Sequence, residues 1–157
     1  EGRRHLISRG IAGAATVTAV SVGASGVALA MSDPTLKEIV VPVAALPVQL
    51  NGFRIVQLSD IHFGATLRET FAEHLVERVN ALNPDLVAIT GDLVDGSVAD
   101  LGAAVQKLTQ IKARHGIFFV TGNHEYYSGA SAWVDTFIVI CSQNFLSDLQ
   151  SKISTLV

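Results

Sequence analysis

The sequence has one cysteine and few charged residues. Cys141, the only cysteine among 157 residues, cannot form an intramolecular disulfide, so cysteine content indicates no redox compartment. Charged residues make up 16% of the chain and hydrophobic residues 49%, which is a large apolar share for a soluble domain. There are no internal repeats and no low-complexity tracts. The length allows one domain with a substantial core.

An excess of basic charge is also absent. Beyond Ala30, 8 of the 11 Lys and Arg side chains and 13 of the 14 Asp and Glu side chains remain, which gives a net charge of -5. Proteins that coat nucleic acids need a basic surface. The acidic balance therefore argues against a nucleic-acid-coating surface.

Charge is missing altogether from Gly10 to Ala30, a run preceded by Arg3, Arg4 and Arg9. As a helix this run would be about 30 Å long, enough to cross a bilayer. The arginines before it and Ala-Leu-Ala at its end are typical of a twin-arginine export signal. Its small residues equally suit a retained anchor, and a buried soluble helix is the least favoured reading. We therefore predict a membrane-anchored or exported protein with its acidic domain on the extracytoplasmic side.

Four apolar runs are predicted to be strands, and helical periodicity separates the last three. The predicted strands are residues 37–43, 53–58, 86–90 and 117–120. Strands that alternate with helices predict an α/β fold with right-handed crossovers. The polar residues 32–36 are predicted to be a linker before this domain.

The two predicted helices have recognisable start signals. Thr66 and Glu69 have the spacing of a capping box, and the apolar stripe that follows stops at Pro84. Ser97 is predicted to cap the second helix, with Gly116 at its end.

The pattern is less clear beyond Gly129. Ser131 could cap a short helix that carries Trp133, but the apolar run 136–141 is typical of a strand. Residues 136–157 are therefore an unassigned tail, which a reading-frame error would explain.

Polar side chains directly follow each of the last three strands. They are Asp60 and His62, Asp92 and Asp95, and Asn123 and His124. Carboxyl ends of parallel strands meet at one edge of a sheet, so these side chains should meet there. Each pair alone is more often a turn or a surface pair. The intervals from Asp60 to Asp92 and from Asp92 to Asn123 are nearly equal, and each has the length of a βα unit, which makes the combination specific.

This residue set predicts a metal site. Asp60 and His62 are two residues apart, so in an extended backbone their side chains point to the same face and can bind one ion. The Asp92 carboxylate has two oxygens and can bridge two cations, and Asn123 offers an amide oxygen. His124 suits either ligation or proton delivery. Oxygen and nitrogen ligands favour Mn, Fe, Zn or Co over thiolate-binding metals.

The motifs Asp60-x-His62, Gly91-Asp92-x-x-Asp95 and Gly122-Asn123-His124-Glu125 resemble the first three signature blocks of the calcineurin-like metallophosphoesterases. The flanks 55–62 and 122–129 resemble especially the bacterial branch with an N-terminal export signal or membrane segment. The resemblance covers about residues 37–135. It implies the first half of an α/β sandwich, a mixed sheet with flanking helices, preceded by an N-terminal hydrophobic helix.

The resemblance also implies roles for the site residues. Asp60 and His62 would hold one divalent metal ion, Asp92 would bridge two, and Asn123 would hold the second. His124 would stabilise the transferring phosphoryl group or protonate the leaving oxygen, oriented by Asp95. Water activated by the two metals would hydrolyse a phosphomonoester or phosphodiester, such as a nucleotide-lipid pyrophosphate or a cell-envelope phosphodiester. Glu125 is predicted to be a structural partner rather than a catalyst.

The sequence departs from the family in one respect. The family takes further ligands from a later histidine and a Gly-His-x-His block, and no histidine follows His124 here. We therefore expect a truncated enzyme with an uncovered sheet face. The alternative is an inactive half-domain that binds a metal weakly or pairs with another chain; no oligomeric state is predicted. The expected organisation is a signal or anchor at 1–31, a linker at 32–36, a partial metallophosphoesterase domain at 37–135 and the tail at 136–157.

Overall fold

The computed structural model describes residues 13–26 and 34–154, and side chains are described as far as residue 142. The chain divides into two compact units, Glu1–Glu38 and Ile39–Val157. In the first unit, residues 13–26 are helical. No helix in the described ranges combines the length and apolarity needed to cross a bilayer. Much of the predicted signal or anchor at 1–31 lies outside the described residues.

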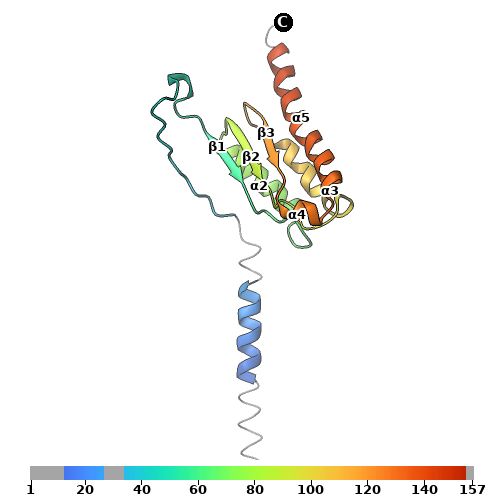
Figure 1. Cartoon of the computed structure of the whole chain (residues 1–157). Helices are drawn as coiled ribbons and strands as arrows, with labels where there is room; N and C mark the ends of the chain where they lie inside the picture. The colour runs from blue at the N-terminus through green and yellow to red at the C-terminus, as the bar shows by residue number, and fades with distance from the viewer. Residues whose placement is uncertain (1–12, 27–33, 155–157) are drawn as a thin grey trace, which may run out of the picture. The chain divides into compact units, whose positions relative to one another are not determined.

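The second unit is an α/β fold around a three-stranded sheet (Figure 1). The strands β1 (Ile55–Leu58), β2 (Leu86–Thr90) and β3 (Ile117–Val120) are parallel and lie in the order β1-β2-β3. The connections are α2 (Glu69–Ala81) and then α3 (Val98–Gln106) with the 3-10 helix η2 (Lys107–Gln110). After β3 come the short α4 (Asn123–Tyr127) and the long α5 (Ala130–Ser154), and the 3-10 helix η1 (Val48–Leu50) precedes β1. The predicted order of the last three strands and their helices is confirmed.

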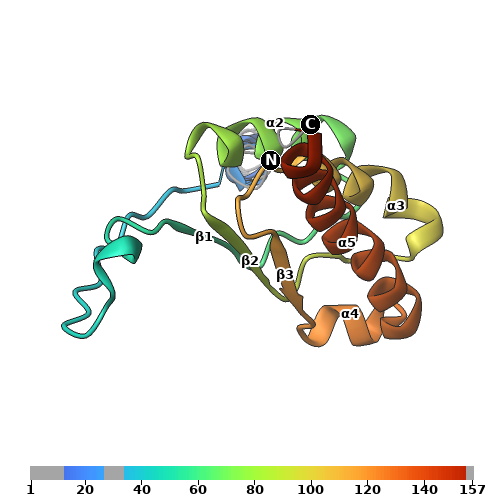
Figure 2. The same cartoon turned by 90° about the horizontal axis from the view of Figure 1, so that it is seen from above.

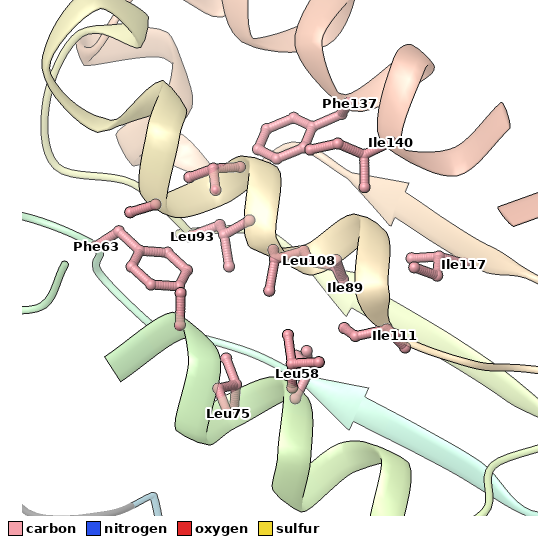
Figure 3. Packing of buried hydrophobic residues seen from close by; sticks show 14 of the residues in the cluster. Leu58, Phe63, Leu75, Ile89, Leu93, Leu108, Ile111, Ile117, Phe137 and Ile140 are labelled. Carbon is pink, nitrogen blue, oxygen red and sulfur yellow. The ribbon is translucent and has the colours of Figure 1, made fainter. Parts of the chain in front are cut away.

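Helices α2, α3 and α5 cover one face of the sheet (Figure 2). Buried and exposed residues alternate along the strands, so the inward residues Val56, Leu58, Val87 and Ile89 join the core. Figure 3 shows Leu58 and Ile89 of the strands among side chains of α2, η2 and α5, which include Leu75, Leu108 and Phe137.

The opposite face of the sheet is open in the described part of the chain. Ile55 is 58% exposed, Phe118 57% and Val120 61%. Parallel sheets are normally covered on both faces. A groove of about 720 Å³ also runs between β3 and α5, and the predicted site residues are not part of its lining.

The predicted strand at 37–43 is wrong. These residues have no regular structure, and Ile39, Val40 and Val41 are exposed. A strand needs a neighbour to satisfy its backbone groups, and no strand of the described sheet pairs with this run. The sheet is also parallel throughout rather than mixed.

The helix boundaries were predicted with mixed success. Ser97 caps α3 as predicted, because its side chain accepts a hydrogen bond from the Asp100 backbone N–H. The capping box at Thr66 is wrong: α2 begins at Glu69 after Arg68, and the Gly64 N–H bonds to the Leu67 carbonyl, which keeps this stretch in a turn. Gly116 has a φ of 86° and turns the chain into β3 instead of ending a helix.

The strand-like run 136–141, which the sequence pattern left unassigned, is part of α5. Trp133, Phe137 and Ile140 are at most 2% exposed, and their spacing of four and three residues places them on one helical face. The Phe137 ring stacks on Phe119 of β3, with centroids 3.8 Å apart. Residues 136–141 are therefore helical because one face of the helix packs against the sheet, although their β-branched composition is typical of a strand.

Candidate metal centre

The loops after β1 and β2 continue side by side beyond the sheet. The Asp60 N–H donates to the Gly91 carbonyl at 3.3 Å, and the His62 N–H donates to the Asp92 carbonyl at 3.1 Å. Phe63 then forms a parallel bridge with Val94. Both loops thus deliver their polar side chains to the same end of the sheet, as the sequence predicted.

Three site residues have left-handed backbone conformations that non-glycine residues seldom adopt. The φ angles are 54° at Asp60, 53° at His62 and 50° at Asp92. Such conformations cost on the order of 1 kcal/mol each, persist only where the surroundings enforce them, and cluster at functional sites. The expectation that Asp60 and His62 lie in extended backbone is therefore wrong.

Gly91 must be glycine for two reasons. Its φ is 87°, and a Cβ there would lie 2.5 Å from the Gly122 backbone nitrogen. Only glycine tolerates both the left-handed conformation and this approach. The contact holds the loop after β2 against the loop after β3, which brings Asp92 close to His124.

Asp95 binds both histidines of the site. The His62 Nδ1 lies 2.9 Å from Asp95 Oδ2, and the His124 Nδ1 contacts Oδ1 of the same carboxylate. The two imidazole rings meet edge to face, with centroids 4.5 Å apart. Because Asp95 accepts from both Nδ1 atoms, the Nε2 atoms are left for a ligand or a proton. The pairing with His124 was predicted, whereas the pairing with His62 was not.

The two histidines also determine how Asp95 ionises. Partial burial opposes ionisation, but hydrogen bonds from His124 and His62 outweigh it and hold the pKa of the Asp95 carboxyl below its ordinary value. The carboxylate therefore stays charged beside the two imidazoles.

His62, Asp92 and His124 form a cluster with the composition of a metal site. Their ligand atoms all lie within 4.8 Å of one another. Two imidazole nitrogens and one carboxylate oxygen suit Mn, Fe, Zn or Co. The residues present therefore fit a divalent transition metal.

Asp92 makes further contacts with the loop after β3. The His124 N–H donates to Asp92 Oδ1 at 2.9 Å. One terminal atom of the Asn123 amide lies 3.0 Å from Oδ2 and 3.2 Å from Oδ1. With nitrogen in that position Asn123 donates to Asp92, whereas with oxygen there three oxygens converge, an arrangement that a cation would stabilise. Asn123 thus lies beside Asp92, with its amide in hydrogen-bond reach of that carboxylate.

Asp60 is placed differently from its predicted partners. Its carboxylate accepts a hydrogen bond from the Ser59 hydroxyl, and it is not part of the three-residue cluster.

Glu125 has more contacts than its sequence pattern predicted. It is fully buried and accepts hydrogen bonds from four backbone N–H groups. Its place three residues after Gly122 is the sequence signal of a capping box, which indicates one of those four bonds.

The fold and the site together define an α/β protein in which two histidines and a carboxylate that could hold a metal ion gather at the carboxyl ends of parallel strands. The chain belongs to the calcineurin-like phosphoesterase family, whose sequence profile matches residues 53–151. A "transmembrane protein with metallophosphoesterase domain" from Danio rerio is 45% identical over 112 residues, which are 71% of this chain and 25% of that protein. An uncharacterised metallophosphoesterase of Campylobacter jejuni is 39% identical over 106 residues, which are 68% of this chain and 28% of that protein.

A UDP-2,3-diacylglucosamine pyrophosphatase of Chlamydia muridarum is 32% identical over 78 residues, or 49% of this chain and 24% of that protein. The chain thus spans about a quarter of the length of these curated relatives. They include animal and bacterial proteins, so the predicted link to the bacterial branch stays a prediction. No solved structure matches the chain significantly.

Proposed function

We propose that this chain carries the core of a phosphoesterase site that hydrolyses phosphomonoester or phosphodiester bonds with two divalent ions of the Mn, Fe, Zn or Co group. The cluster of His62, Asp92 and His124, with both imidazoles bound to one carboxylate, is the observation that carries the proposal. Membership of the family supports phosphoester hydrolysis as the reaction class.

The proposed ligand assignment is the one that the family resemblance implies. His62 and Asp60 would hold one ion, Asn123 would hold the other, and Asp92 would contact both. When bound, such ions stabilise negative charge on phosphoryl oxygens and make water a better nucleophile. The protein fixes the ligand orientations through Asp95 on His62 and through the His124 N–H on Asp92.

We assign proton delivery to His124. Asp95 holds its Nδ1, so the protonated imidazole keeps an Nε2–H for the leaving oxygen, and the carboxylate stabilises the imidazolium charge. Its place in the metal cluster also permits ligation. The two roles differ in their dependence on the leaving group, because a general acid accelerates loss of phenolate more than loss of the weakly basic p-nitrophenolate.

The test is hydrolysis of bis(p-nitrophenyl) phosphate and diphenyl phosphate by the full chain with added Mn²⁺. We expect Asp92→Asn to lower kcat/KM at least about 100-fold, because charge stabilisation at the phosphoryl group is lost. Asp135→Asn, an exposed substitution of the same kind on α5, should have no effect. His124→Ala should reduce diphenyl phosphate hydrolysis more than bis(p-nitrophenyl) phosphate hydrolysis; an equal loss with both substrates would contradict proton delivery.

An inactive half-domain is the second candidate. It is favoured by the ligand count, because the described residues bring together one cluster of three ligand side chains, fewer than two ions need. Under this hypothesis the folded chain binds Mn²⁺ weakly and neither ester is hydrolysed. Turnover that depends on Asp92 would exclude it.

We propose a nucleotide-lipid pyrophosphate or a cell-envelope phosphodiester as the substrate. The similarity to a UDP-2,3-diacylglucosamine pyrophosphatase supports the first of these. We also propose that the domain is anchored to or exported across a membrane, on its extracytoplasmic side. The uncharged run 10–30 behind three arginines and the names of the transmembrane relatives support this location.

A further inference from the structure

Glu125 is the one charged residue that is fully buried in the described part of the second unit. Its exposed fraction is 0%, and it lies in the first turn of α4, between His124 and the exposed Tyr126. Burying a carboxylate is costly unless hydrogen bonds compensate for its lost hydration. Its partners therefore indicate its role.

Four backbone N–H groups from two loops donate to the Glu125 carboxylate. Oε1 accepts from Leu93 at 2.7 Å and Val94 at 3.3 Å, and Oε2 accepts from Asp92 at 3.0 Å and Gly122 at 2.6 Å. Successive backbone N–H groups that converge in this way form an anion-binding nest. Here the anion is a side chain of the protein itself.

Three of the four donors are consecutive residues of the loop after β2. Turning their N–H groups toward one point requires an unusual backbone, and Asp92 has a φ of 50° there. The bonds to Glu125 compensate for this conformation. In return, the Asp92 carboxylate accepts the N–H of His124, the residue before Glu125. Hydrogen bonds therefore run in both directions: residues 92–94 donate to the Glu125 side chain, and the His124 backbone donates to the Asp92 side chain.

We propose that Glu125 is the positioning residue that fixes Asp92 in its metal-binding orientation. It does so through the backbone: the carboxylate holds the amides of residues 92–94, and these set the direction of the Asp92 side chain. This inference rests on the proposed function in so far as Asp92 is a metal ligand.

A purely local role for Glu125 makes a different prediction. As the third residue of α4 it accepts the N–H of Gly122, the N-cap residue, which is the half of a capping box that glycine allows, and that role needs only the Gly122 N–H. Loss of the cap would loosen α4 and leave the loop after β2 unchanged. The positioning role predicts that the loop after β2 responds as well.

The test compares Glu125→Gln with Glu77→Gln, an exposed substitution of the same kind on α2. Glutamine keeps the size of the side chain but has one acceptor oxygen, so its NH₂ group faces two of the four donors. Whichever way the amide turns, at least one N–H of residues 92–94 loses its acceptor, so we expect faster hydrogen exchange among the amides of residues 92–94 in Glu125→Gln, with protection of β1, β2 and β3 retained. We also expect Mn²⁺ affinity, measured by calorimetric titration, to fall roughly 10-fold or more. Glu77→Gln should behave as wild type in both measurements.

Two outcomes would overturn the inference: unchanged exchange at all the amides of residues 92–94 in Glu125→Gln, or, where wild type binds Mn²⁺, an unchanged Mn²⁺ affinity in this variant. If wild type itself binds no Mn²⁺, the proposed function fails, and the exchange measurement still decides whether Glu125 holds the loop. If Glu125→Gln does not fold, Glu125→Asp gives the answer. It keeps the charge but shortens the reach, so wild-type exchange and affinity in that variant would refute the positioning role.

Discussion

At the residue scale, the site depends on backbone conformations that few side chains tolerate. Asp60, His62 and Asp92 all have positive φ angles, and Gly91 approaches Gly122 too closely for any side chain. That polar side chains gather at this end of the sheet was predictable, because each follows an apolar run. The left-handed conformations were not, because they arise from hydrogen bonds between loops that are far apart in the sequence.

Replacing Gly91 should be unusually damaging. In Gly91→Ala the new Cβ would lie 2.5 Å from the Gly122 nitrogen, and φ is 87°. Backbone and side chain must both shift, so we expect a loss of about 3 kcal/mol or more in the free energy of unfolding, measured by urea denaturation.

Gly52→Ala is the matched control. Gly52 has a φ of 78°, but a Cβ there meets nothing within 4 Å. Gly52→Ala should lower the free energy of unfolding only by the cost of the left-handed conformation, about 1–2 kcal/mol. Equal losses in the two variants would show that the contact between Gly91 and Gly122 is unimportant.

Asp95 should make stability depend on pH in the acid range. The histidines hold its pKa below the ordinary value of 3.8, so the unfolded chain takes up the proton first as the pH falls. The contribution is therefore complete above about pH 4 and is lost as the pH falls through the lower, folded-state pKa. In metal-free samples, the difference in unfolding free energy between wild type and Asp95→Asn should shrink below that pH. A difference that grows on acidification would contradict the pairing.

At the element scale, α5 shows where sequence patterns are insufficient. Residues 136–141 are rich in β-branched side chains, which favour a strand, yet the i, i+4, i+7 spacing of Trp133, Phe137 and Ile140 places one helical face on the core. The helices α2 and α3 were predictable because their apolar stripes lie between clear turn signals. The predicted strand at 37–43 failed because composition cannot supply a pairing partner.

The packing of α5 can be tested at Phe137. Its side chain is 2% exposed and stacks between Phe119 and Trp133, so Phe137→Ala should lower the free energy of unfolding by about 3–5 kcal/mol. Ile138→Ala, at the neighbouring position with 60% exposure, should change it by less than about 1 kcal/mol. Thermal or urea unfolding followed by circular dichroism measures both. Similar effects at the two positions would mean that α5 does not pack on the sheet through this face.

At the scale of the whole molecule, the sheet has one covered face and one face that the described residues leave open. Phe118 and Val120 lie on the open face, and the groove between β3 and α5 adjoins them. The uncovered face was predictable from the resemblance to a two-sheet sandwich. The site nevertheless forms on the three-stranded sheet alone, because its described side chains come from the loops after β1 and β2 and from the start of α4, which directly follows β3.

The central claim is that these loops hold a divalent metal through His62 and Asp92, with Asp95 orienting the histidines. The most direct test is pulsed electron paramagnetic resonance of Mn²⁺ added to the full chain, which detects nitrogen nuclei bound to the metal. We predict a histidine nitrogen coupling that is lost in His62→Ala and retained in His124→Ala, because His124 is assigned to proton delivery. Bound Mn²⁺ without nitrogen coupling, or a coupling that survives in His62→Ala, would contradict the account.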